Sequence, residues 1–294
     1  MLKYRAISFP LLLGLLTAMI FWQPWGRCIF AGLGTLAVFL LGLEFFAMLG
    51  ELGAASYRKT GAFLLALAFF TVCALTGLLP GNWAMPIASW TFLLLLLTPF
   101  LGWFLLLCVK DRKSLLVRLP VTLGGVALLF ITVLPLLTTY GTYWRYSYIG
   151  NVNFLFLALV TKAMDTGGYI FGLLSNRILP GGNHKIAPSF SPKKSWEGFF
   201  GGMLFSVGVA LLLFKFKLQP FTMGLGMTAL AGVVLAVGSF AGDLTESALK
   251  RAAGVKDSGN YIPGMGGVFD VLDSFIYNGM LFSVLWYFSK MDFK

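Results

Sequence analysis

Long apolar runs, separated by short polar stretches, make up most of the chain. Nine of these runs come close to the roughly 20 residues that an α-helix needs to cross a bilayer. The runs fall at residues 7–23, 29–50, 61–79, 86–108, 119–138, 152–174, 197–214, 223–241 and 268–288. This pattern predicts an all-α, polytopic integral membrane bundle of about nine transmembrane helices.

The composition agrees with a membrane protein. Hydrophobic residues make up 58% of the chain and charged residues 11%, with a mean hydropathy of +0.85. Soluble domains have roughly 45–50% apolar and about 25% charged residues. Nine spans would use about 180 residues, which leaves no room for a large soluble domain. We therefore expect a single membrane domain over 1–294, with N-terminal spans in 1–140 and the candidate chemistry in 150–294.

The net charge of +11 fits a membrane orientation. Lysine and arginine collect in the cytoplasmic loops of membrane proteins. If the N-terminus is cytoplasmic, 15 basic residues lie on the cytoplasmic side and six on the other. This asymmetry favours a cytoplasmic N-terminus and accounts for the charge without a nucleic-acid partner. The same charge attracts anionic membrane lipids.

The most polar part of the chain lies between the eighth and ninth runs. Five of the 11 acidic residues fall between Asp243 and Asp273. Acids are costly to place between two membrane-like segments, so they indicate a functional site. On a helix, Asp243, Glu246 and Ser247 would share one face.

These carboxylates need a positive partner, because nearby acids suppress each other's ionisation. Hard oxygen ligands suit Mg²⁺, which takes one or two carboxylates together with substrate phosphates. We predict Asp243, Asp270 and Asp273 as the metal ligands. Glu246 is predicted to support these ligands without binding the cation itself, or to form an ion pair with Lys250 four residues on. The identity of a second cation is left open.

A second polar stretch precedes the seventh run. Lys193 and Lys194 lie there with Ser191 and Ser195, and Ser195 is placed to cap the following helix. Lysines and a helix N-terminus attract anions, so this loop is a candidate phosphate cradle. The alternative is a basic loop that only sets membrane topology.

Three further features carry polar groups near apolar runs. Lys162 and Asp165 are three residues apart in the sixth run and can form an ion pair on one helix face. The glycines of the turn 263–267 allow backbone amides to face an anion closely, which makes Gly266 and Gly267 candidate substrate contacts. Glu44 is an acid inside the second run, either functional or the structural partner of a base elsewhere in the bundle.

The polar stretch after the eighth run resembles the signature of the phosphatidate cytidylyltransferases, also called CDP-diacylglycerol synthases. The family pattern is Ser-x-x-Lys-Arg, four residues, Lys-Asp, then Pro-Gly-His-Gly-Gly-x-x-Asp-Arg-x-Asp-Ser. The spacing is kept here, while Met265 replaces the usual His and Val271 the usual Arg. The matching residues are Ser247, Lys250, Arg251, Lys256, Asp257, Pro263, Gly264, Gly266, Gly267, Asp270, Asp273 and Ser274.

Two other segments are similar to motifs of the same family. Asp165-Thr-Gly-Gly-Tyr-Ile-Phe-Gly172 is similar to its Asp-Thr-Gly-Ala-Tyr-x-x-Gly segment. Ser191-Pro-Lys-Lys-Ser-Trp-Glu-Gly198 is similar to its Ser-Pro-Lys-Lys-Thr-x-Glu-Gly motif, with Ser195 in place of Thr. The resemblance is clearest from about Asp165 onward.

The resemblance implies an enzyme of phospholipid biosynthesis that uses Mg²⁺. Its substrates are CTP and phosphatidate, its products CDP-diacylglycerol and pyrophosphate, and its active site faces the cytoplasm from the inner membrane. The implied catalytic residues are Asp243, Lys250, Arg251, Lys256, Asp270 and Asp273. The implied substrate contacts are Asp165, Ser191, Lys193, Lys194, Ser195, Glu246, Gly266 and Gly267.

Two alternatives remain at this level. A related CTP-dependent enzyme could act on another lipid phosphate, of an archaeal-type or polyprenyl lipid. A membrane transporter would place polar residues near the bilayer midplane in repeat-related broken helices, whereas the polar residues here gather toward one face. Assembly into a homodimer is left open.

Overall fold

The computed structural model describes residues 2–22, 25–78, 112–141, 149–220 and 222–291, and most of these residues are helical. They form two compact units, and each is described by itself. Unit 1 comprises Met1–Arg145 and Ala252–Val271, and unit 2 comprises Tyr146–Arg251 and Leu272–Lys294. The expected all-α membrane bundle is confirmed, because seven of the described helices are long and apolar enough to cross a membrane.

Seven of the nine predicted spans coincide with these helices, within a few residues at most ends. The span predicted at 86–108 lies outside the described residues. The span predicted at 7–23 falls on helix α1 (Leu2–Phe21), which is not one of the seven. The total of nine spans and the cytoplasmic N-terminus therefore stay predictions, as does the description of 1–294 as one membrane domain.

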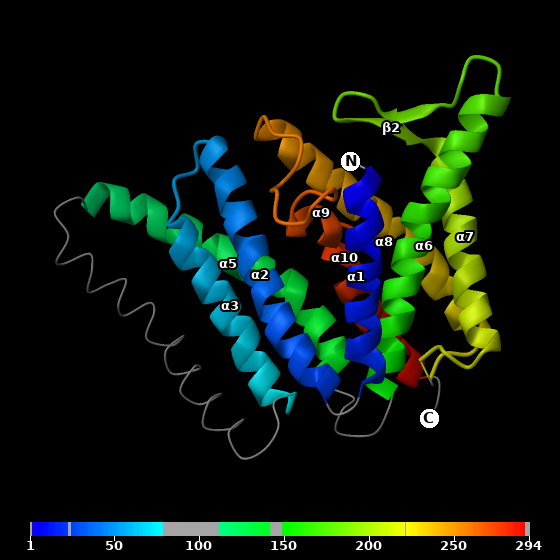
Figure 1. Cartoon of the computed structure of the whole chain (residues 1–294), viewed down its shortest axis with the longest axis horizontal. Helices are drawn as coiled ribbons and strands as arrows, with labels where there is room; N and C mark the ends of the chain where they lie inside the picture. The colour runs from blue at the N-terminus through cyan, green and yellow to red at the C-terminus, as the bar shows by residue number, and fades with distance from the viewer. Residues whose placement is uncertain (1, 23–24, 79–111, 142–148, 221, 292–294) are drawn as a thin grey trace. The chain divides into compact units, whose positions relative to one another are not determined.

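Unit 1 is built on α1, α2 (Trp25–Glu51), α3 (Arg58–Leu75) and α5 (Arg112–Gly141). Helix α2 packs along α3, and α3 packs on α5 (Figure 1). Phe46 is buried at this junction, and a Cβ on Gly125 would lie 2.6 Å from its ring. A small residue at that position therefore lets the aromatic ring fill the space between the helices.

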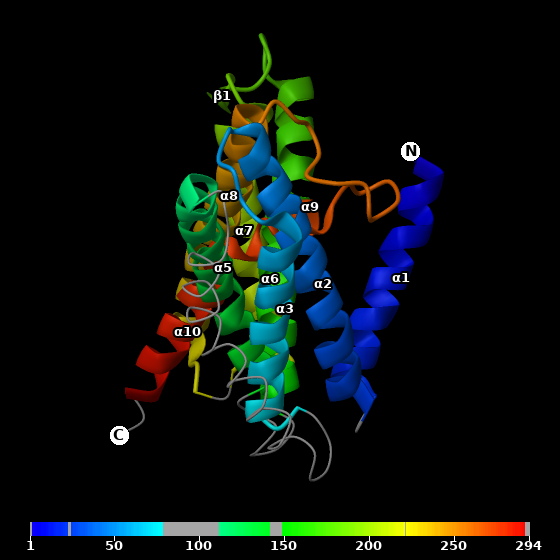
Figure 2. The same ribbon diagram turned by 90° about the vertical axis from the view of Figure 1, so that its left-hand side faces the viewer.

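Unit 2 contains α6 (Ile149–Ile178), α7 (Trp196–Lys215), α8 (Leu225–Ala252) and α10 (Phe275–Met291). The short helix α9 (Val268–Leu272) crosses from unit 1 into unit 2. Helices α6 and α7 lie side by side in both ribbon views (Figures 1 and 2). Glycines line this contact, since a Cβ on Gly167 would lie 3.0 Å from the Cα of Gly202. The glycines of the sixth run thus permit close approach of a neighbouring helix.

Helix α6 continues without a break through the polar run that includes Lys162 and Asp165. Helix α8 likewise extends past the predicted span end at 241 to Ala252. The charged segment that follows the apolar part of α8 is therefore helical, and its acids have the helical spacing expected from the sequence.

A small β-hairpin, which the sequence patterns did not predict, connects α6 to α7 (Figure 1). Strand β1 (Lys185–Ala187) pairs antiparallel with β2 (Ser191–Ser195). The predicted cap is confirmed, because the Gly198 amide donates to the Ser195 hydroxyl at 3.2 Å as α7 begins. Both neighbouring lysines of the candidate phosphate cradle lie on β2, between the two residues that pair with β1, Ser191 and Ser195.

Candidate active site

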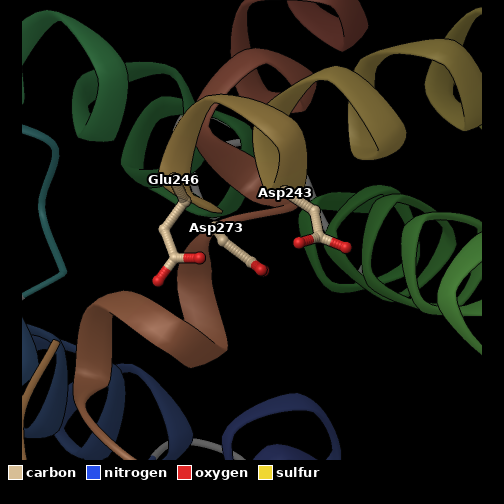
Figure 3. A group of neighbouring side chains, drawn as sticks. All are labelled: Asp243, Glu246 and Asp273. Carbon is tan, nitrogen blue, oxygen red and sulfur yellow. The ribbon is translucent and has the colours of Figure 1, made fainter. Parts of the chain in front are cut away.

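Three carboxylates of unit 2 form a compact acidic cluster. Asp243 and Glu246 lie on α8, and Asp273 lies just before α10 (Figure 3). One oxygen from each side chain lies within 4.8 Å of the others. Glu246 is buried, whereas Asp243 and Asp273 retain some exposure. The grouping combines two acids fixed by helical spacing with a third that only the packing of the C-terminal segment brings to them.

Lysines lie against the acids of unit 2. Among the described residues, three carboxylates each have a lysine within 3.0 Å, and Asp273 has the ammonium of Lys162 at a longer 3.9 Å. The three close pairs are Lys162 with Asp165 at 3.0 Å, Lys194 with Asp243 at 2.7 Å, and Lys250 with Glu246 at 2.7 Å. These contacts set three lysines against four carboxylates, which leaves one negative charge over. The predicted Lys162–Asp165 and Glu246–Lys250 pairs are present.

A cavity of about 310 Å³ opens beside the acidic cluster. Its polar lining includes Ser191, Lys193 and Lys194 from β2, Asp165 from α6 and Asp243 from α8. The hairpin thus brings the candidate phosphate cradle to the end of α8 that carries the acids. Sequence spacing could not show this contact, because the lysines of β2 and Asp243 of α8 lie on different elements that are far apart in the chain.

Aromatic residues also line the cavity. Phe199 of α7 and Phe240 of α8 line it, and their ring centroids are 4.8 Å apart. The ammonium of Lys194 lies 4.8 Å from the centre of the Phe240 ring, within reach of a cation–π contact. The sequence analysis did not select either phenylalanine, since both are ordinary members of apolar runs.

Lys162 connects α6 to the segment that carries Asp273. Its ammonium donates to the Ser274 hydroxyl at 2.6 Å and to Asp165 at 3.0 Å. The Ser239 hydroxyl donates to the second oxygen of Asp165, also at 3.0 Å. Asp165 is therefore held from two helices, and Lys162 has a wider set of partners than the sequence indicated.

Asp270 belongs to unit 1, where a tight turn surrounds its carboxylate. Its Oδ2 accepts hydrogen bonds from the amide of Gly267 at 2.7 Å and from the amide and hydroxyl of Ser258 at 3.0 Å. Gly266 has φ of +94°, a conformation suited to glycine, and a Cβ there would collide with Asp270. The glycine turn does face an anion closely, and that anion is an internal carboxylate. The predicted roles of Asp270, Gly266 and Gly267 toward cation and substrate stay predictions.

Glu44 also belongs to unit 1 and accepts hydrogen bonds from the same loop. The amides of Val268 and Phe269 donate to it at 2.9 and 2.8 Å, and the Ser258 hydroxyl at 2.9 Å. The sequence suggested a basic partner for a structural acid here, whereas Glu44 accepts hydrogen bonds from two backbone amides and a hydroxyl. Nothing in the local sequence around Glu44 identifies partners more than 200 residues away.

Two basic residues with predicted catalytic roles have exposed side chains. Arg251 lies at the end of α8, and Lys256 lies in the loop that belongs to unit 1. Arginine and lysine side chains are exposed in most proteins, so exposure alone does not indicate a catalytic role. Their predicted roles in catalysis stay predictions, as does that of Lys250, which pairs with Glu246.

The chain as a whole was also compared with known protein families. The model of the cytidylyltransferase family matches residues 3–289. The chain belongs to the cytidylyltransferase family. The resemblance seen in three short motifs thus extends over both units, including the N-terminal helices.

Curated relatives of this cytidylyltransferase family member are phosphatidate cytidylyltransferases. One from Staphylococcus epidermidis is 43% identical over 131 residues, which is 45% of this chain and 47% of that protein. One from Staphylococcus aureus is 41% identical over 133 residues, again 45% and 47% of the two chains. Phosphatidate cytidylyltransferase 5, chloroplastic, from Arabidopsis thaliana is 50% identical over 93 residues, 32% of this chain and 23% of that one. The chain spans about half the length of the bacterial relatives it matches.

The acidic cluster of this cytidylyltransferase family member fits a divalent cation. It offers three oxygen ligands within 4.8 Å of one another, and one of them, Asp273, has its nearest lysine at 3.9 Å, farther than in the three close pairs. Hard oxygen donors of this kind suit Mg²⁺. Asp243, Glu246 and Asp273 are therefore the residues of unit 2 that could hold it.

Proposed function

We propose that the chain transfers the cytidylyl group of CTP to phosphatidate and so makes CDP-diacylglycerol. The observation that carries the proposal is the cavity in which Lys193 and Lys194 lie beside Asp243 of the acidic cluster. Lysines for phosphates next to acids for a cation are the two requirements of nucleotidyl transfer, which depends on positioning and charge neutralisation. Family membership and the names of the relatives supply the nucleotide and the lipid.

The reaction is a substitution at the α-phosphorus of CTP. A phosphate oxygen of phosphatidate forms a new bond to that phosphorus, the bond from it to the bridging oxygen breaks, and pyrophosphate leaves. The attacking oxygen is already anionic near neutral pH, so the reaction needs no strong general base. The single histidine of the chain is consistent with such chemistry.

Several polar residues of the cavity have a role in this proposal. Lys193, Lys194 and the Ser191 hydroxyl bind CTP phosphates, and Asp243 with its two acidic neighbours binds Mg²⁺. A bound Mg²⁺ ion supplies positive charge that offsets the charge on the phosphates. Phe199 and Phe240 reduce the access of water, which would otherwise compete with the lipid phosphate for CTP.

Lys194 has a second part, because its ammonium already lies 2.7 Å from Asp243. The lysine is a tethered cation next to a predicted metal ligand. We infer that CTP phosphates draw Lys194 away from Asp243, which frees this carboxylate for Mg²⁺. Nucleotide and cation should therefore bind synergistically.

The membrane setting is consistent with these substrates. The described helices make the chain a multi-pass membrane protein, and phosphatidate is a membrane lipid. We propose that the site faces the cytoplasm of a bacterial inner membrane, where CTP is available. Homodimer formation and a second cation remain open.

The proposal is tested with the chain purified in detergent, α-labelled CTP and a panel of lipid phosphates. Labelled CDP-diacylglycerol should form with phosphatidate and Mg²⁺, and chelator should abolish its formation. Asp243→Asn serves as the inactive control. Transfer to a different lipid phosphate alone would establish the related-enzyme alternative, and no transfer to any lipid phosphate would reject the enzyme function in favour of a transporter.

A further inference from the structure

Glu44 is a fully buried acid in unit 1. It lies on α2 within a candidate membrane span, and its exposure is 1%. A carboxylate loses its hydration when it is buried, so it is tolerated only where hydrogen-bond donors or opposite charges replace the water. The donors around Glu44 therefore indicate what it does.

Those donors all come from one segment, Ser258–Phe269, which is called the loop below and includes the first two residues of α9. The Val268 amide donates to Oε1, and the Phe269 amide and the Ser258 hydroxyl donate to Oε2, at distances between 2.8 and 2.9 Å. Hydrogen bonds to an ionised carboxylate are about twice as strong as neutral ones. Glu44 thus fastens both ends of the loop to α2.

Two glycines let the loop backbone approach the carboxylate. A Cβ on Gly259 would lie 2.5 Å from Glu44 Oε1, and a Cβ on Gly267 would collide with Oε2. Any side chain at either position would push the loop away from α2. Gly267 was predicted from the sequence to contact substrate. The contact with Glu44 in unit 1 is by itself enough to require glycine at this position.

The same loop orients Asp270. Ser258 and Gly267 both donate to Asp270 Oδ2, and the Ser258 hydroxyl lies between the two carboxylates, 2.9 Å from Glu44 and 3.0 Å from Asp270. The residues that contact Glu44 therefore also set the position of Asp270. Release of the loop from Glu44 would move the donors on which Asp270 depends.

We propose that Glu44 is a positioning residue, which holds the loop Ser258–Phe269 in the conformation that orients Asp270. The inference rests on the proposed function and on the separate sequence-based prediction that Asp270 is a cation ligand. Glu44 acts through the loop and does not touch the substrates. A residue of the N-terminal half of the chain thereby helps to position residues of the signature motif more than 200 positions away in sequence.

The test compares Glu44→Gln with Glu51→Gln. Glutamine keeps the size of Glu44 but replaces one acceptor oxygen with an amide donor, which would face the loop's own donors. Glu51 is an exposed acid at the end of the same helix, so its substitution is a matched control. Hydrogen–deuterium exchange of the peptide 256–272 reports the loop, and steady-state kinetics report the reaction.

We expect faster exchange in 256–272 for Glu44→Gln and no change in the peptides of α3. Turnover should fall about tenfold or more, because small displacements of a reacting group are costly. The KM for CTP should change little, and the Mg²⁺ concentration for half-maximal activity should rise. Glu51→Gln should match the unaltered chain in every measurement. This separation of turnover and Mg²⁺ dependence from CTP binding would not arise from a purely structural role.

Each opposing result has a defined meaning. Unchanged exchange would show that the loop does not depend on Glu44, and faster exchange with normal turnover and Mg²⁺ dependence would show that Glu44 is only a core residue. If Glu44→Gln does not insert, Ser258→Ala tests the same link, and normal turnover and exchange in that variant would also overturn the inference. No cytidylyl transfer by the unaltered chain would instead count against the proposed function, while the exchange measurement would still test the contact.

Discussion

The ammonium of Lys194 lies 2.7 Å from Oδ2 of Asp243, at the edge of the cavity beside the acidic cluster. The lysine comes from strand β2 and the aspartate from helix α8. Two groups assigned to different ligands thus neutralise each other in the free protein. If Lys194 binds CTP phosphates and Asp243 binds the cation, as proposed, each binding event should break this pair and the two should be coupled.

Lys194→Met tests this coupling, because methionine keeps much of the side chain's length and removes the charge. The KM for CTP should rise roughly 10- to 150-fold, as expected for loss of a charged hydrogen bond worth about 1.5–3 kcal/mol. Mn²⁺ binding without nucleotide, measured by electron paramagnetic resonance, should instead tighten roughly two- to fivefold, because a competing ion pair of about 0.5–1 kcal/mol is lost.

Lys193→Met is the matched control for this experiment. Lys193 lines the same cavity, but it forms no ion pair with another residue in the described part of the chain. Its substitution should raise the KM for CTP and leave Mn²⁺ affinity unchanged. Equal Mn²⁺ affinity in Lys194→Met and the unaltered chain would show that the pair does not control the cation site. Unchanged CTP kinetics in both variants would indicate that the lysines of β2 only set membrane topology.

The three acids predicted from the sequence to bind a cation are each tested by exchange for the corresponding amide. Asp243→Asn, Asp270→Asn and Asp273→Asn should each lower turnover about a hundredfold or more, since loss of metal-based charge stabilisation costs several kcal/mol. Turnover is measured with saturating CTP and Mg²⁺ in protein shown to be inserted, with Glu51→Gln as a control. Near-normal turnover in any one of the three variants would reject the predicted role of that residue as a cation ligand.

Met265 replaces a histidine of the family pattern, and its side chain should not be essential. The backbone amide of Met265 donates to the Ile262 carbonyl at 3.0 Å within the glycine turn. A thioether carries no charge and is only a weak acceptor. Met265→Ala should therefore keep at least roughly a tenth of the activity. A loss as deep as that of the amide variants would mean that packing by this side chain is critical.

The contact between α6 and α7 should depend on glycine at position 167. A Cβ there would lie 2.6 Å from the Cβ of Phe205, too close without movement of one helix. Overpacking of this kind costs about 1–3 kcal/mol, so Gly167→Ala should lower the thermal unfolding temperature in detergent. Gly208→Ala is the control, because a Cβ at that exposed position of α7 meets nothing within 4 Å. A similar unfolding temperature for both variants would contradict the close packing.

Much of the fold could be predicted from the sequence because a bilayer imposes a length. A segment that crosses the hydrocarbon core must satisfy its own backbone and expose apolar side chains, so helical spans are visible as long apolar runs. The apolar run predicted the span only to residue 241, whereas helix α8 continues to Ala252. Its last turns leave the apolar run but remain helical, and hydropathy does not distinguish a polar helix from a loop.

Contacts within one helix were also predictable. The spacing of Lys162 and Asp165, and of Glu246 and Lys250, places each pair on one helix face whatever the rest of the chain does. The grouping of Asp243 with Glu246 follows in the same way. The helical repeat is a local property of the backbone, so three- and four-residue spacings are enough to determine such pairs.

Only the tertiary structure decided which distant groups meet. It brings Asp273 to the acids of α8, places Lys194 of the hairpin against Asp243, and fastens the loop of Ser258 to Glu44. These contacts depend on how helices and loops pack, and the sequence interval between their members carries no geometric information. The sequence by itself therefore determined the spans, the helical faces and the types of chemical group, while packing between elements assembled those groups into a cavity and a supported loop.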